Sequence, residues 1–124
     1  MSLGRSRRSF ASGLLALAGL SVGVAFAPAL AQTDHSTVIR VLEGGRDFRA
    51  RARAALALGS SADPAVVPAL IAALEDSNPA VRAAAATGLG RLADARALAP
   101  LRVRLSDPER AVRTEAQRAI AAIE

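Results

Sequence analysis

Three stretches of this chain repeat one another at a spacing of 31 residues. Arginine recurs at Arg51, Arg82 and Arg113, and apolar residues keep the same register, as at Ala54, Ala85 and Ala116 and at Leu58, Leu89 and Ile120. A period of roughly 20 to 50 residues with helical spacing inside it is typical of solenoids, in which no unit buries its apolar face alone. The repeat therefore predicts a stack of similar helical units.

Apolar spacing within the repeats predicts six short helices and no strand. The first is expected over Val38 to Leu42 and the second over Asp47 to Leu58. Glycines at the ends of these two segments favour left-handed helix stops; they are Gly44, Gly45 and Gly59. Each later repeat has an N-cap residue followed by proline, which predicts a helix start; the pairs are Asp63-Pro64, Asn78-Pro79 and Asp107-Pro108. The fold class is therefore all-α.

Residues 1–31 are typical of an export signal, because arginines precede an uncharged run rich in alanine, leucine and valine. Ala29 and Ala31 have the spacing that signal peptidase accepts, which predicts cleavage after Ala31 and a mature chain beginning at Gln32. An uncleaved membrane anchor is the alternative, since the run is about long enough to span hydrocarbon. Pro28 and the glycines of the run favour cleavage, so no stable membrane insertion is expected afterwards.

The stretch Ser6-Arg7-Arg8-Ser9-Phe10 resembles a twin-arginine signal. Ala11 and Ser12 stand where that signal has Leu and Lys, so the general secretory route remains open. Either route leads to a periplasmic or secreted protein. The expected organisation is a signal peptide over 1–31, a loose lead-in over 32–36 and a repeat domain over 37–124.

Composition excludes several classes of function. Removal of the signal leaves 13 arginines against 11 acidic groups, a net charge of only +2. Phe48 is then the single aromatic residue, so a nucleic-acid partner is not expected, because single-strand binding usually needs stacking platforms. The chain has no cysteine, and the fold must depend on apolar packing without disulfides.

Two segments carry a resemblance to a known family. Asn78-Pro79-Ala80-Val81-Arg82 and Asp107-Pro108-Glu109-Arg110-Ala111-Val112-Arg113, with the apolar residues that follow each, resemble HEAT repeats of the short bacterial type, also called phycobilisome-lyase HEAT-like repeats. The resemblance covers about Asp47 to Glu124 and implies a short right-handed α-solenoid of about three helix pairs. It also implies that Arg82 and Arg113 form a structural ladder with the turn acids Asp94 and Asp107.

No catalytic or metal-binding set is found in the sequence. The only histidine, His35, has no second histidine or cysteine to complete a ligand set. Ser60 and Ser61 lie in a predicted turn without a base to activate them. HEAT-repeat metalloenzymes bind iron through His-Glu pairs that this chain lacks. We therefore expect no enzymatic activity, no metal and no cofactor.

Two groups of arginines are candidate protein-binding sites. Arg46, Arg49 and Arg53 have the spacing of one basic stripe on the second helix. Arg102 and Arg104 belong to a later helix, where Arg102 takes the place of the apolar Ile71 of the preceding repeat. That exchange indicates an exposed groove or edge that meets an acidic group. An ordinary solvated face is the alternative for both groups.

The sequence thus predicts an exported, non-catalytic adaptor or scaffold that binds an unidentified protein partner. A first alternative is a structural module whose units stack end to end in self-association. A second is an accessory protein related to HEAT-repeat metalloenzymes.

Overall fold

The computed structural model describes residues 34–124, and this part of the chain is helical without strands, which confirms the all-α class. Residues His35–Glu124 form one compact unit. Its α-helices are α2 (Ser36–Gly44), α3 (Phe48–Gly59), α4 (Val67–Ala73), α5 (Pro79–Leu92), α6 (Leu98–Val103) and α7 (Arg110–Ile123). Short 3-10 turns precede α4 and flank α6; they are η1 (Pro64–Val66), η2 (Ala95–Ala97) and η3 (Arg104–Ser106).

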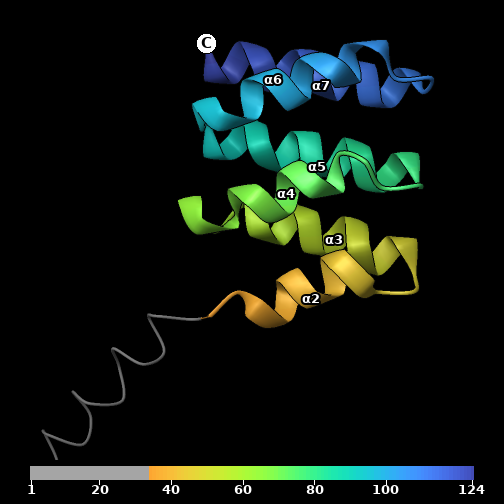
Figure 1. The fold of residues 1–124 in the computed structure, drawn as a ribbon, viewed down its shortest axis with the longest axis vertical. Helices are drawn as coiled ribbons and strands as arrows, with labels where there is room; N and C mark the ends of the chain where they lie inside the picture. The colour runs from red at the N-terminus through yellow and green to blue at the C-terminus, as the bar shows by residue number, and fades with distance from the viewer. Residues whose placement is uncertain (1–33) are drawn as a thin grey trace, which may run out of the picture. The chain divides into compact units, whose positions relative to one another are not determined.

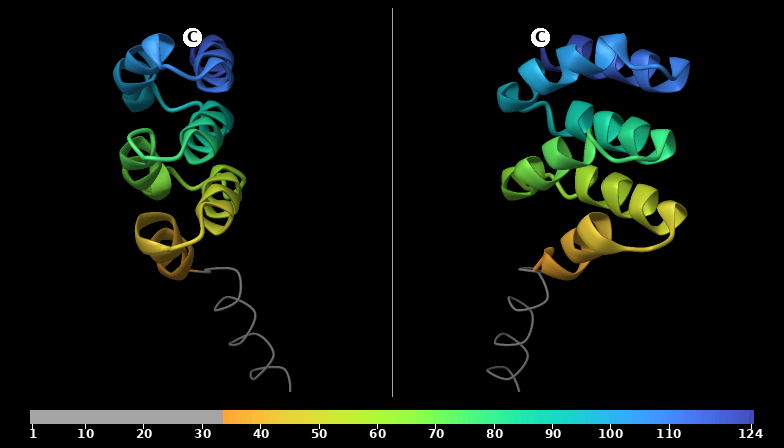
Figure 2. Two further views of the ribbon diagram at one scale, coloured as in Figure 1. Left: turned by 90° about the vertical axis from the view of Figure 1, so that its right-hand side faces the viewer. Right: turned by 45° about the vertical axis from the view of Figure 1, so that its right-hand side comes forward.

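The helices form two rows that follow the repeat (Figure 1). Helices α3, α5 and α7 begin at residues 48, 79 and 110, a spacing of 31, and we call them the first row. Helices α2, α4 and α6 form the second row, and Figure 2 shows the two rows as separate columns. The predicted helical stack is confirmed, with three pairs of helices in the described residues.

First-row helices approach one another through glycine and alanine. Helix α5 packs against α3 on one side and α7 on the other. A Cβ placed on Gly59 would lie 2.3 Å from Cα of Gly88, and one on Gly90 would lie 2.9 Å from Cα of Ala119. Such distances leave no room for a side chain, so the helices touch backbone to backbone.

Large aliphatic side chains fill the core. Val81 and Val112, which are one repeat apart, are both fully buried. The other large, fully buried side chains are Leu58, Val66, Val67, Leu70, Leu74, Leu89 and Leu101. Near the C-terminal end, Leu105 is 39% exposed although its counterpart Leu74 is 1% exposed. Burial at this position therefore depends on a following unit.

Polar side chains cap two of the three helical starts that the sequence predicts from a capping residue followed by proline. Asp63 accepts a hydrogen bond from the amide of Ala65, and Asn78 accepts one from Ala80. The start predicted at Asp107-Pro108 is wrong, because α7 begins at Arg110 with Glu109 at its N-cap. Asp107 adopts extended backbone before that helix and is held there by other contacts, described below.

The glycines predicted to stop helices in a left-handed conformation do not adopt one. Gly45 has φ −63°, and Gly59 is still helical. The residues with positive φ are Ala62 (58°) and Ala93 (53°), which occupy equivalent positions of the repeat. Gly59 is required for close helix approach instead of for chain reversal.

The predicted signal peptide, its cleavage after Ala31 and the lead-in residues 32 and 33 lie outside the described residues. Helix α2 begins at Ser36, one residue before the predicted start of the repeat domain. Among residues 34–124, no helix has the length and apolar character needed to cross a membrane.

Candidate functional site

Two equivalent ion pairs join successive units of the stack. Arg51 donates from Nε and Nη2 to the two carboxylate oxygens of Asp76 at 2.9 and 3.0 Å. Arg82 makes the same bidentate contact with Asp107, again at 2.9 and 3.0 Å. This geometry is the strong form of an arginine–carboxylate pair. Both pairs span 25 residues and connect a first-row helix to the turn before the next one.

The same arginines also bind backbone carbonyls, and this links the pairs into one ladder. Nη1 of Arg51 donates to the carbonyl of Gly45 at 2.7 Å, and Nη1 of Arg82 donates to that of Asp76 at 2.9 Å. The turns at Asp76 and Asp107 therefore each receive one arginine on the carboxylate and the next arginine on the carbonyl. We call this chain of contacts the arginine ladder.

Electrostatics favour the charged forms along the arginine ladder. The hydrogen bond from Arg82 lowers the pKa of Asp107, with burial opposing it and the Glu109 amide assisting. Burial raises the pKa of Asp76, but hydrogen bonds from Arg51 and the Asn78 amide outweigh that effect and leave it lowered. Asp107 is only 3% exposed, so leaving its carboxylate unpaired would destabilise the fold strongly.

The structure corrects the predicted ladder at several members. Asp94 is not part of it, because its carboxylate pairs with Arg96 at 2.9 Å and accepts from the Arg96 amide. Arg113 donates from Nη1 to the carbonyls of Asp107 and Pro108, at 2.7 and 3.1 Å, and has no carboxylate partner in the described chain. Sequence reasoning missed Arg51 as a member, although its register with Arg82 could have identified it.

The candidate residues Arg102 and Arg104 have different surroundings. Arg104 pairs with Asp107 at 3.2 Å and supports the arginine ladder. Arg102 is exposed and reaches Glu124 at 3.1 Å, so the acid that it meets belongs to the same chain. An ion pair between such exposed groups contributes little to stability.

The predicted basic stripe is only partly on a helix. Arg49 and Arg53 lie on α3 and are exposed, and Arg49 stands over the Phe48 ring at 4.8 Å. Arg46 lies in the turn before α3, and its carbonyl accepts a bond from Arg51 at 3.4 Å. The three arginines therefore do not form one continuous helical stripe.

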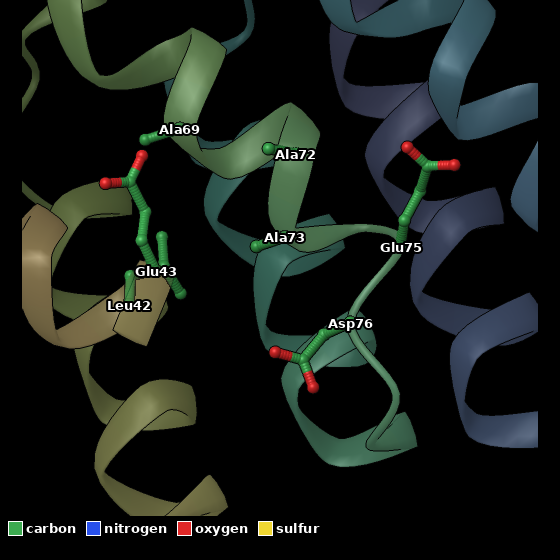
Figure 3. Close-up of a pocket in the computed structure, with 7 residues that line it drawn as sticks. All are labelled: Leu42, Glu43, Ala69, Ala72, Ala73, Glu75 and Asp76. Atoms are coloured by element: carbon green, nitrogen blue, oxygen red, sulfur yellow. The ribbon is translucent and has the colours of Figure 1, made fainter. Parts of the chain in front are cut away.

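Hollows separate the second-row helices, in contrast to the close contacts of the first row. One of about 260 Å³ lies between α2 and α4. Figure 3 shows Glu43 and Glu75 on opposite sides of it, with alanines of α4 between them. Asp76 also lines this hollow, but its carboxylate is held by Arg51. The acids do not converge on one point, so the hollow has no set of oxygens for a cation.

A second hollow, of about 240 Å³, lies between α4 and α6 and is more apolar. Its lining residues are Ile71, Leu74, Glu75, Pro100, Val103 and Arg104. Val103 is 60% exposed, the highest value among the exposed large apolar residues of the described chain. We call this hollow the α4–α6 groove.

His35 lies within reach of an acid in the next turn, which the sequence did not predict. Its Nε2 is 3.5 Å from the carboxylate of Asp63. Over residues 34–124, no group of three or more histidine or acidic side chains is arranged to hold a metal ion.

Comparison with known proteins agrees with this architecture. A family model described as HEAT repeats matches residues 36–121. No curated protein matches the chain.

Proposed function

Because the chain belongs to the HEAT repeat family, whose repeats typically mediate protein interaction, we propose that it is an exported, non-catalytic adaptor that binds a protein partner. Its short period of 31 residues favours the phycobilisome-lyase HEAT-like subtype. Its proposed location is the periplasm or the extracellular space, and the support for this is the signal-like pattern of residues 1–31.

The α4–α6 groove is the observation that carries the proposal. Its lining combines an exposed apolar side chain, Val103, with the apolar residues Ile71 and Pro100 and the charged residues Glu75 and Arg104. A recessed apolar surface with a polar rim is the usual anatomy of a protein-binding site. The partner is expected to place an apolar side chain in the groove.

Site-specific crosslinking in the native host tests this function. A photoreactive amino acid at Val103 should form adducts with one protein, identified by mass spectrometry. The matched control places the same probe at Ala111, which is exposed on α7 and does not line the groove. Equal adduct patterns from both positions would contradict the assignment of the groove.

Three further measurements test the rest of the proposal. The intact mass of the protein from the host should correspond to a chain that begins at Gln32; a full-length mass in the membrane fraction would contradict export with cleavage. Light scattering separates an adaptor from the alternative of a self-stacking module, because the adaptor should be monodisperse and monomeric. Metal analysis separates it from an accessory metalloprotein, which would carry stoichiometric metal.

A further inference from the structure

Arg113 is oriented like the two arginines of the ladder that hold carboxylates. Its Nη1 contacts with two consecutive carbonyls, at 2.7 and 3.1 Å, reproduce those of Arg82, at 2.9 and 3.2 Å. In Arg82 these contacts leave the Nε and Nη2 edge facing Asp107. In Arg113 the same edge has no acidic partner within residues 34–124.

We propose that the Nε and Nη2 edge of Arg113 is a receptor for a carboxylate of a protein partner, which would complete the arginine ladder. This inference rests on the proposed function, because it specifies where and by what chemistry the adaptor binds. The guanidinium is already fixed by its carbonyl contacts, so less conformational entropy is lost when the carboxylate binds.

The outer face of α7 argues against another first-row helix as the occupant. Equivalent positions on α3 and α5 carry Ala55 and Ala86, which are fully buried against the next helix, whereas α7 has the exposed Gln117. Ala121 stands at the repeat position that is occupied by Gly59 in α3 and Gly90 in α5, where a Cβ would meet the backbone of the next first-row helix. The close approach of the first row is therefore blocked at α7, and a smaller acidic turn or loop fits better.

The N-terminal end of a second copy also lacks the required group. The position one repeat before Asp76 is Gly45, which has no carboxylate, and Arg46 follows it. The occupant is consequently an acidic loop of a different protein, with an apolar side chain to cover Leu105, which is 39% exposed.

A peptide titration observed by NMR at the arginine side chains tests this inference. The probe copies residues 105–109 with glutamine in place of Glu109, so that the Asp107 carboxylate is its only acidic side chain. At about pH 6 that carboxylate is ionised. The probe should shift the Nε–H signal of Arg113 in a saturable way and leave those of Arg51 and Arg82 in place, because their carboxylate sites are occupied.

Matched controls make the result specific. The same peptide with asparagine at the Asp107 position should produce no shift. Arg113→Lys keeps the charge but removes the paired N–H donors of the guanidinium, so it should weaken peptide binding by at least about fivefold. The control Arg110→Gln changes an exposed residue of the same helix and should leave peptide binding unchanged. No shift at Arg113, or equal shifts with both peptides, overturns the inference. The peptide pair needs no variant, so a folding defect of Arg113→Lys does not affect the outcome.

Failure of this inference is distinguishable from failure of the proposed function. If crosslinking at Val103 identifies a partner but the peptide does not shift the Nε–H signal of Arg113, the protein is an adaptor that does not bind its partner through Arg113. If neither experiment detects binding, both proposals are wrong.

Discussion

Replacing Gly59 by alanine should destabilise the stack strongly, because this glycine lets α3 touch the backbone of α5. The new Cβ would lie 2.3 Å from Cα and 3.1 Å from the carbonyl oxygen of Gly88. Carbon atoms in ordinary contact are about 3.5 to 4.0 Å apart, so α3 and α5 must separate by more than about 1 Å. Both atoms of the partner belong to a backbone and cannot turn away.

The net effect follows from two opposing contributions. Overpacking costs about 1 to 3 kcal/mol and occasionally more. Glycine-to-alanine exchange in a helix returns at most about 1 kcal/mol. We expect Gly59→Ala to lower the free energy of unfolding by about 2 kcal/mol, which for a domain of this size lowers Tm by about 8 to 16 °C. Thermal unfolding followed by circular dichroism measures it.

Other glycines of the chain provide the controls. Gly90→Ala should cost less, because its Cβ would meet Cα of Ala119 at 2.9 Å. Gly44→Ala meets nothing within 4 Å and should stabilise by about 0.5 to 1 kcal/mol. If Gly59→Ala and Gly44→Ala melt at the same temperature, the backbone contact between first-row helices does not exist as described.

Three further predictions concern the core, the turns and the ladder. Leu101→Ala should cost about 2 to 5 kcal/mol in chemical denaturation because Leu101 is fully buried, whereas Leu105→Ala should cost clearly less; equal losses would contradict the burial assignment. Ala93→Gly should raise Tm, because Ala93 has a left-handed φ of 53° that glycine adopts without strain. The control Ala95→Gly, in a 3-10 turn, should lower Tm. A decrease in Tm for both variants would argue against the left-handed turn. The pKa of Asp107 is lowered in the folded state, so its carboxylate stabilises the fold fully above about pH 4 and less as the pH falls through the folded-state pKa. Asp107→Asn should therefore make the free energy of unfolding less sensitive to acid. An acid unfolding profile equal to that of the unchanged protein would contradict this.

The sequence was sufficient to predict the helices because the 31-residue period and the apolar spacing are local signals. It did not predict that Ala62 and Ala93 would adopt positive φ, because glycine is the usual residue in that conformation. Asp94 was assigned to the ladder for a similar reason: a turn acid has several arginines within reach, and only the structure shows that Arg96 is the one that it binds.

The candidate site was harder to predict than the fold. The sequence marks Arg102 as a protein-binding candidate that meets an acidic group, and only the structure shows that the acid within its reach is Glu124 of the same chain. The open edge of Arg113 becomes visible only when its carbonyl contacts are compared with those of Arg82, which requires coordinates.

The two rows of helices have consequences for elasticity. One side of the stack is already at atomic contact and cannot shorten, whereas the side with hollows can still close. Bending that compresses the hollow side should therefore be easier than bending that compresses the glycine-lined side. A ligand bound in the α4–α6 groove would keep α4 and α6 apart and fix the curvature of the stack. Its affinity would then depend on how far the stack must bend to admit it.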